Sequence, residues 1–146
     1  MKQAEVTTRA NETALLRFPA ELVKLRRSRN LSQKALALTL RMDQSQLSGL
    51  ERGTRPPPSQ VTLDSISTAL SLGSSEQRQL EWSARHDRCI RLVADAVAST
   101  QETALVSQVL SAALLMNSRQ MEGLSDYLRS LQLAAAQMNV LTERVN

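Results

Sequence analysis

The chain has 146 residues, a formal net charge of +4, and only one Phe, one Trp and one Tyr. That length allows one domain, or one small domain with an appendage. The core must be built from Leu, Ala, Val and Met, and β-branched residues never cluster in alternation, so the composition excludes a β-rich fold and predicts an all-α chain.

The basic excess lies in the first half of the chain. Residues 1–72 hold 11 Lys or Arg against 6 Asp or Glu, whereas residues 73–146 hold 7 against 8. This asymmetry is expected if the first half faces phosphates, although a solvated basic face would produce it as well.

Several classes of protein are excluded by what the sequence lacks. One cysteine, Cys89, cannot form an intramolecular disulfide and suits a reducing compartment. No apolar run approaches the ~18 residues that span a bilayer, so we expect a cytoplasmic protein without membrane segments. His86 and Cys89 are an isolated pair, too few for a zinc site, and Asp87 and Asp95 are expected to form surface ion pairs among arginines. We therefore predict no enzyme activity, no metal and no cofactor.

The N-terminal part is predicted to be an arm followed by a helix. Residues 1–14 are polar and weakly patterned, which indicates a flexible arm. A helix is predicted from Pro19, with Leu22 and Leu25 on its inner face. The basic residues near its end complement the helix dipole or approach a phosphate backbone; they are Lys24, Arg26, Arg27 and Arg29.

Two short amphipathic patterns, separated by a sharp turn, occupy residues 31–55. Leu36, Ala37 and Leu40 share one face of the first, and Leu47 and Leu50 share one face of the second. The small Ala37 suits the contact between two closely crossed helices.

The ends of these two helices have clear signals. Ser32 and Asp43 are predicted N-caps, and Gly53 is predicted to end the second helix in the left-handed conformation. Only Arg41 and Met42 remain between the helices, too few for anything except a tight turn.

The outward face of the second helix carries short polar side chains whose donors and acceptors suit contact with the edges of DNA bases. These residues are Gln44, Ser45, Gln46, Ser48, Gly49 and Arg52. A face that served only solubility would more often carry Glu and Lys.

Further helices are predicted downstream. Ser59 is expected to cap a helix that ends near Leu70 and is closed by Gly73, and a capping box from Ser74 to Gln77 opens a helix over residues 75–98. A second capping box, from Ser99 to Glu102, opens the next helix, which breaks at residues 117–118.

The final helix, over residues 119–144, has apolar residues at heptad spacing. We predict a dimer interface along this seam: Met121, Leu124, Leu128, Leu131, Ala135 and Met138. The alternative is that the helix only completes an intramolecular core. Opposed charges typical of a freestanding coiled coil do not flank the seam, so a packed dimer or small bundle is favoured over a long zipper.

The motif in residues 31–55 resembles the phage-repressor-like, or XRE-type, helix-turn-helix family. The resemblance rests on Leu31-Ser32-Gln33, Leu36-Ala37, Gln44-Ser45, Leu47-Ser48 and Leu50-Glu51-Arg52-Gly53. It extends over about 55 residues, roughly 19–72. Two departures are Arg41, where the family has Gly, and the three prolines at 56–58.

The resemblance implies an N-terminal five-helix DNA-binding domain over residues 15–86. The heptad seam and the apolar C-terminal helices, which lie beyond the resemblance, indicate a helical oligomerisation region over 87–146. The resemblance further implies that Gln33 anchors a phosphate, that Gln44 contacts adenine, and that Arg52 and Arg55 hold phosphates. The full expected DNA-binding set is Gln33, Lys34, Asp43, Gln44, Ser45, Gln46, Ser48, Gly49, Arg52, Thr54 and Arg55. Glu51 is expected to pair internally with an arginine of the first helix.

The resemblance also implies a transcriptional regulator that binds double-stranded DNA as a homodimer on a pseudo-palindromic operator. Family activators often carry acidic residues on the first helix of the motif, but Lys34, Ala35 and Leu38 occupy those positions here. Repression by occlusion is therefore favoured over contact activation. The apolar Leu38 is expected to be covered by the C-terminal helices.

Two other functions stay open at this point. The C-terminal half could bind a partner protein, as in an antitoxin that represses its own promoter. Alternatively, the chain could be a scaffold that keeps the helix-turn-helix only as a packing unit.

Overall fold

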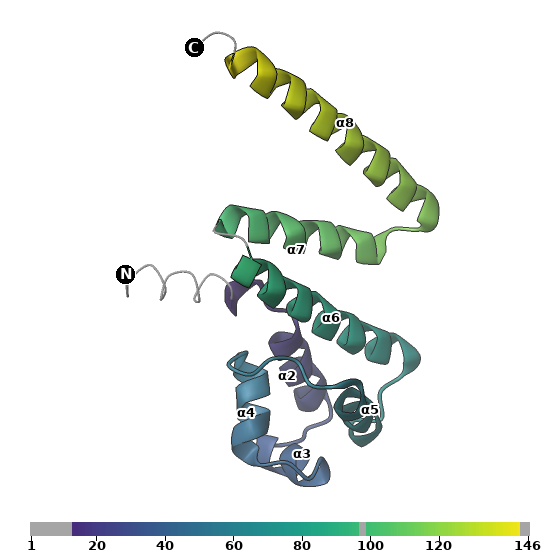
Figure 1. Cartoon of the computed structure of the whole chain (residues 1–146). Coiled ribbons are helices and arrows are strands. Elements are labelled where there is room, and N and C mark those ends of the chain that lie inside the picture. Colours follow the sequence, from purple (N-terminus) through teal and green to yellow (C-terminus); the bar gives the residue numbers. More distant parts are fainter. Residues whose placement is uncertain (1–12, 97–98, 144–146) are drawn as a thin grey trace, which may run out of the picture. The chain divides into compact units, whose positions relative to one another are not determined.

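The computed structural model describes residues 13–96 and 99–143. Every regular element in this part of the chain is a helix, which confirms the all-α prediction (Figure 1). The helices are α2 (Phe18–Ser28), α3 (Gln33–Thr39), α4 (Gln44–Arg52), α5 (Gln60–Ala69), α6 (Ser74–Ala96), α7 (Thr100–Leu115) and α8 (Ser118–Glu143). The predicted arm over residues 1–14 lies outside the described residues except for its last two positions.

The chain divides into two compact units, residues 1–108 and 109–146, and the division falls within α7. The first unit contains α2 to α6 and the first part of α7. The sequence-based boundary after His86 falls inside α6, which continues without a break to Ala96.

The first unit has one aliphatic core, to which each helix from α2 to α6 contributes. Leu22, Leu36, Leu47, Leu63 and Leu80 come from these five helices in turn, and each is at most 1% exposed. Burying one such side chain stabilises the fold by roughly 1.5–3 kcal/mol. The predicted inner faces of the helix-turn-helix are therefore confirmed, and the core fixes how α3 and α4 cross.

Serine side chains cap three helices, as the sequence predicts. The Ala35 N–H donates to Ser32 Oγ at 3.0 Å before α3, and the Thr62 N–H donates to Ser59 Oγ at 3.5 Å before α5. The Glu102 N–H donates to Ser99 Oγ at 3.4 Å at the start of α7. Each cap satisfies a backbone donor that the helix itself leaves without a partner.

The predicted junction between α5 and α6 is wrong in detail. The left-handed residue after α5 is Ser71, with φ 49°, rather than Gly73. Ser74 is already the first residue of α6. The Gly73 N–H donates to the Glu76 carboxylate at 3.1 Å, so Glu76 takes the role that the predicted capping box gave to Gln77.

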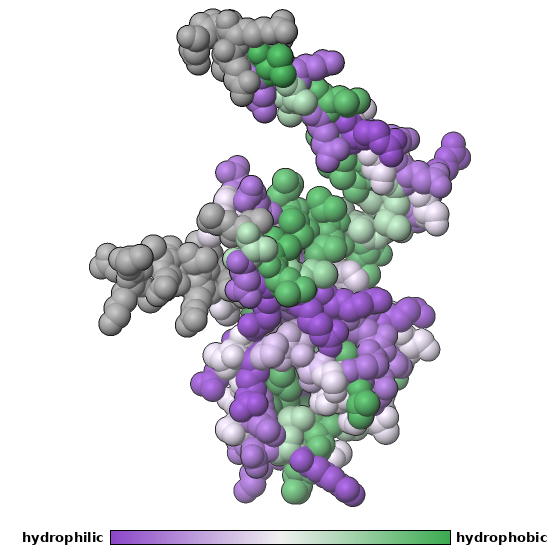
Figure 2. All heavy atoms as spheres, viewed as in Figure 1, coloured by the Kyte–Doolittle hydropathy of each residue, from purple (hydrophilic) through white to green (hydrophobic). Residues whose placement is uncertain are grey.

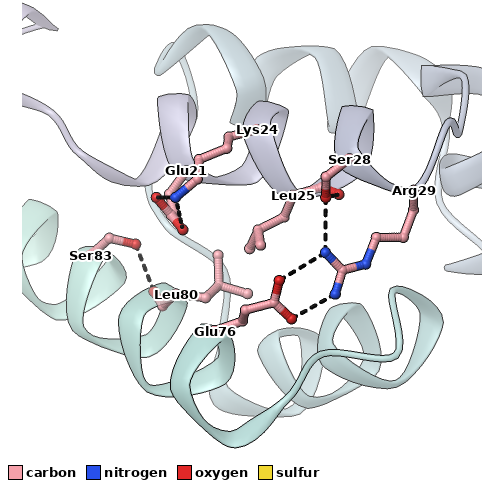
Figure 3. A network of polar contacts seen from close by, with 8 residues as sticks. All are labelled: Glu21, Lys24, Leu25, Ser28, Arg29, Glu76, Leu80 and Ser83. Carbon is pink, nitrogen blue, oxygen red and sulfur yellow. Dashed lines mark hydrogen bonds and ion pairs between the residues drawn. The ribbon is translucent and has the colours of Figure 1, made fainter.

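An ion pair joins α2 to the start of α6 (Figure 3). Arg29 donates through Nη1 and Nη2 to the two carboxylate oxygens of Glu76, at 2.8 and 2.6 Å, and its Nε donates to the Leu70 carbonyl at 3.0 Å. Hydrogen bonds from Arg29, together with the one from the Gly73 N–H, lower the pKa of Glu76 from 4.5 to about 2. Beside this pair, Leu25 and Leu80 are buried between the two helices.

A buried carboxylate on α6 caps the start of α2. Asp87 is 1% exposed, and its two oxygens accept the Arg17 and Phe18 N–H groups at 2.8 and 2.9 Å. A negative charge at this position satisfies two free donors and complements the positive end of the α2 dipole. The prediction that Asp87 forms a surface ion pair is therefore wrong, whereas Asp95 is exposed as expected.

The neighbouring His86 connects α6 to α7. Its Nδ1 lies 2.8 Å from Asp87 Oδ1, and its Nε2 lies 3.0 Å from Ser107 Oγ. The Trp82 ring packs beside the imidazole, with 5.1 Å between ring centroids. In the neutral imidazole one ring nitrogen donates to the carboxylate and the other accepts from the hydroxyl. The histidine is thus a structural link between two helices.

Helix α7 buries small polar side chains and exposes leucines. Thr103 and Ser107 are 5% and 2% exposed, whereas Leu105 and Leu115 are 59% and 85% exposed. Figure 2 shows apolar side chains gathered over this helix. In α8, every side chain that the structure describes is exposed except the half-buried Leu124. The C-terminal helices therefore present more apolar surface than one chain covers.

The Arg29–Glu76 pair predicts an acid-dependent part of the stability. The folded state keeps Glu76 ionised to lower pH than the unfolded chain does, because its pKa falls from 4.5 to about 2. The stabilisation is therefore complete above about pH 4.5 and is lost as the pH falls towards 2. In chemical denaturation between pH 5.5 and 2.5, Glu76→Gln should flatten the loss of stability, whereas Glu122→Gln, on α8, should not. An unchanged pH dependence in Glu76→Gln would contradict the assignment.

Candidate nucleic-acid interface

Helices α3 and α4 are joined by residues 40–43, in a conformation that the sequence predicts. Arg41 takes a positive φ of 54°, which costs a non-glycine residue about 1–2 kcal/mol. Asp43 occupies the N-cap of α4, and its backbone N–H donates to Gln46 Oε1 at 3.1 Å. Gly53 ends α4 with φ 73°. The tight turn holds the beginning of α4 at a fixed place beside α3.

Four polar side chains form a connected chain, the Glu51 network: Arg26, Glu51, Gln33 and Gln44. Arg26 Nε and Nη2 donate to the two Glu51 carboxylate oxygens at 2.6 and 3.0 Å, which confirms the expected pair with the first helix. Gln33 Nε2 donates to Glu51 Oε2 at 3.0 Å, and Gln44 Nε2 donates to Gln33 Oε1 at 3.4 Å. The network therefore passes from a part-buried ion pair to an exposed amide at the start of α4.

The predicted DNA-facing residues lie on α3, α4 and the adjoining segments, and most are accessible. The exposed ones are Lys34, Asp43, Gln44, Ser45, Arg52, Thr54 and Arg55; the half-buried ones are Gln33, Gln46 and Ser48; Gly49 is buried. The Gln46 side chain accepts the Asp43 N–H, so its carbonyl oxygen serves the helix cap. Gln44 and Ser45 are thus exposed polar side chains at the start of α4.

Gly49 is buried because the side chain of Arg55 lies on it. A Cβ placed at Gly49 would stand 2.9 Å from both Cγ and Cδ of Arg55. The Thr54 and Arg55 N–H groups donate to the Gly49 carbonyl at 3.0 and 3.2 Å, so the loop folds back onto the helix. The glycine therefore allows the close approach of the protein's own Arg55 stem.

Two arginines of α6, which the sequence analysis did not single out, contact this loop. Arg91 Nη2 donates to the carbonyls of Gly53 and Arg55 at 2.6 and 3.3 Å, and Arg88 donates to the Pro58 carbonyl. Prolines lack the backbone donor, so three successive prolines leave nearby carbonyls dependent on donors from elsewhere. The run of prolines is therefore the sequence signal that could have pointed to Arg88 and Arg91.

The basic residues of α2 are mostly committed to internal contacts. Arg26 binds Glu51, Arg29 binds Glu76, and Lys24 lies 3.3 Å from Glu21 on the same helix. Arg27 is exposed. Much of the basic run that the sequence shows therefore stabilises the fold rather than facing a ligand.

The expectation that C-terminal helices cover Leu38 is wrong, since this side chain is 79% exposed. Leu36 and Ala37 turn inward on the short helix α3, which directs Leu38 away from the core. Helix α6 packs against α2 and α5 instead of α3. The outer face of α3 therefore stays open.

The Ser107, His86 and Asp87 side chains line up like a hydrolase triad but lie in the interior. His86 and Ser107 are each 2% exposed, and the Asp87 carboxylate already accepts two backbone N–H groups. A substrate would have no access to the hydroxyl, so the arrangement is structural. Among the described residues, no group of three or more His, Cys, Asp or Glu is placed to hold a metal ion.

Comparison with protein families matches residues 22–76 to a family described as helix-turn-helix. The matched segment begins in α2, includes α3, α4 and α5, and ends in the first turn of α6. It contains all four residues of the Glu51 network. Residues 22–76 are therefore similar to the helix-turn-helix unit of XRE-type regulators. Neither a curated protein nor a solved structure matches it.

The match supports a DNA-binding regulator of transcription, and helices α3 and α4 lie within the matched segment. Within the described residues, no helix is long and apolar enough to cross a membrane.

Gly49→Ala should separate DNA binding from folding. The added methyl group displaces the Arg55 stem, whereas alanine in a helix interior is favoured over glycine by about 1 kcal/mol. We expect thermal stability to stay equal or rise and the dissociation constant for duplex DNA to increase about three- to tenfold. Gly123→Ala, on α8 where an added Cβ meets no atom within 4 Å, is the matched control. Unchanged DNA affinity in Gly49→Ala would show that the position of Arg55 is irrelevant.

Proposed function

We propose that the regulator binds a pseudo-palindromic operator as a homodimer and represses transcription by occluding the promoter. The observation that carries this proposal is the exposed amide of Gln44, oriented by the Glu51 network at the start of α4. A side chain held in this way loses little conformational freedom on binding, which favours specific contact over loose attraction.

Gln44 is the proposed base-reading residue. A glutamine amide offers a donor and an acceptor that match N7 and the N6 amino group of adenine in the major groove. Ser45 follows at the exposed start of the helix, and Ser48 lies one turn further along, so the three polar residues can meet successive base pairs.

The neighbouring residues are proposed to hold the sugar-phosphate backbone. Lys34, Arg52 and Arg55 are exposed around α3 and α4, and Thr54 adds a hydroxyl. Gln33, whose amide already links Glu51 to Gln44, is proposed to contact a phosphate beside the base that Gln44 reads. These contacts would fix the orientation of α4 in the groove.

Dimerisation is proposed to occur through α8. Along the predicted seam, Met121, Leu128, Leu131 and Met138 are 45%, 39%, 47% and 67% exposed. Apolar residues at heptad spacing on an exposed helix of 26 residues suit a second copy of the same helix. Two copies would place two α4 helices about 34 Å apart, one turn of DNA.

The outer face of α3 favours occlusion over activation. Lys34, Ala35 and Leu38 lie there, and none of them carries the negative charge expected of a surface that touches polymerase in activators of this family. Binding alone would then control transcription.

Gln44→Ala should relax base preference at one position of each half-site. Losing a bidentate contact costs about 1–3 kcal/mol at that base pair. Selection of bound sites from random DNA, for wild type and variant, should show the preference lost at that position and retained elsewhere. Gln101→Ala, an exposed glutamine of α7, should leave the selected sequence unchanged. Identical selected sites for wild type and Gln44→Ala would refute the base-reading assignment.

Leu131→Glu should convert the dimer into a monomer. The side chain is already 47% exposed in the single chain, so the substitution costs little until a second copy buries the charge. Sedimentation should show the mass halved, and affinity for a two-half-site duplex should fall at least tenfold. Gln132→Glu adds the same charge beside the seam and should stay dimeric.

Two results would count against this interface. A Leu131→Glu protein that remains dimeric would exclude the seam. Wild-type protein that is monomeric alone and co-purifies with a small neighbouring gene product would favour the antitoxin alternative.

A further inference from the structure

The loop between α4 and α5, residues 53–59, carries a proposed phosphate ligand and has few backbone donors of its own. Three of its residues are prolines, Pro56, Pro57 and Pro58, which have no N–H. Its conformation must therefore be set from outside, because carbonyls left without donors would be costly wherever water is excluded.

One side of the loop is fixed to the recognition helix. The N–H groups of Thr54 and Arg55 and the Thr54 hydroxyl all donate to the Gly49 carbonyl, at 3.0, 3.2 and 3.3 Å. The aliphatic part of the Arg55 side chain lies against Gly49. Arg55 therefore stays beside α4 while remaining exposed to solvent.

The other side of the loop is fixed to α6. Arg91 binds the Gly53 and Arg55 carbonyls, and Arg88 binds the Pro58 carbonyl. Arg88 and Arg91 are half-buried, and the Arg91 Nε is fully enclosed. The Arg91 head group is thus directed at the loop backbone, and its charge also complements the C-terminal end of α4.

We propose that Arg91, assisted by Arg88, is a positioning residue for DNA binding. It holds the Gly53 and Arg55 carbonyls so that Arg55 stays against Gly49 and faces the DNA backbone. The proposal rests on the proposed phosphate contact of Arg55. It assigns a role in recognition to α6 beyond residue 76, where the family match ends.

The first test measures the loop in the free protein. Arg91→Met keeps the stem and removes the donors, so amide exchange of Thr54 and Arg55 should accelerate about tenfold. Exchange of the Leu47 amide, which donates to Asp43 O inside α4, reports whether the helix itself is intact. Arg85→Met removes an exposed arginine from the same helix and should leave all three amides unchanged. Unaltered Thr54 and Arg55 exchange in Arg91→Met would overturn the proposal.

The second test measures binding to a duplex that the wild-type protein selects from random DNA. Arg91→Met should raise the dissociation constant about five- to tenfold in the wild-type background, and less than twofold when Arg55 is already alanine. Arg85→Met, with the same loss of charge, should have less than a twofold effect in either background. Equal effects of Arg91→Met in both backgrounds would mean that Arg91 acts independently of Arg55, and the proposal would fall.

Arg91→Lys provides the conservative comparison and guards against loss of folding. Lysine keeps the charge and a donor for one carbonyl, so it should recover at least half of the lost affinity, on a logarithmic scale. No recovery in a folded Arg91→Lys protein would count against a role through the loop carbonyls. If wild type binds no duplex, the proposed function fails, while the exchange measurement still decides whether Arg91 holds the loop.

Discussion

The hydrogen-bonded pair of Arg26 and Glu51 is the interaction on which the recognition surface depends. Both side chains are at most 11% exposed, and the pair joins the first helix of the domain to the end of α4. Removing one member of such a pair leaves a charge without its partner in the interior, at a cost of about 3–5 kcal/mol. The same carboxylate binds Gln33, and Gln33 binds Gln44. The Glu51 carboxylate thus joins α2 to α4 and also orients Gln44, the proposed base-reading residue.

The first unit and the C-terminal helices use polar and apolar groups in opposite ways. In the first unit, leucines fill the interior, and buried polar groups such as Asp87 and His86 connect one helix to the next. In α7, Thr103 and Ser107 are buried, whereas Leu105 and Leu115 are exposed. In a single chain, such a helix leaves apolar side chains exposed to water. An exposed apolar surface of this kind is consistent with an interface that a second chain covers.

Local rules predicted most of the recognition element, and contacts distant in sequence account for what they missed. The roles of Ser32, Asp43 and Gly53 follow from residue preferences within one turn of helix, and the leucine spacing predicted the inner faces. The positive φ of Arg41 runs against those preferences. Asp87 was misplaced on the surface because its ligands, the Arg17 and Phe18 N–H groups, lie about 70 residues away. Arg91 was overlooked because its acceptors are backbone carbonyls 38 and 36 residues away, and the only sequence signal for them is the neighbouring run of prolines. Leu38 shows the converse error, in which apolar character was equated with burial.

The position of Asp87 has a consequence for the size of the smallest autonomous DNA-binding piece. The family match stops at residue 76, eleven residues before Asp87, whose carboxylate caps the N-terminal end of α2. A polypeptide trimmed to the matched segment would lose that carboxylate. It would also lose Arg88 and Arg91, which donate hydrogen bonds to the loop of residues 53–59. The second half of α6 is part of the scaffold, and the first compact unit extends to Gln108. On the proposed role of Arg91, unwinding of the second half of α6 would weaken DNA binding even though the proposed DNA-contacting residues lie on other elements.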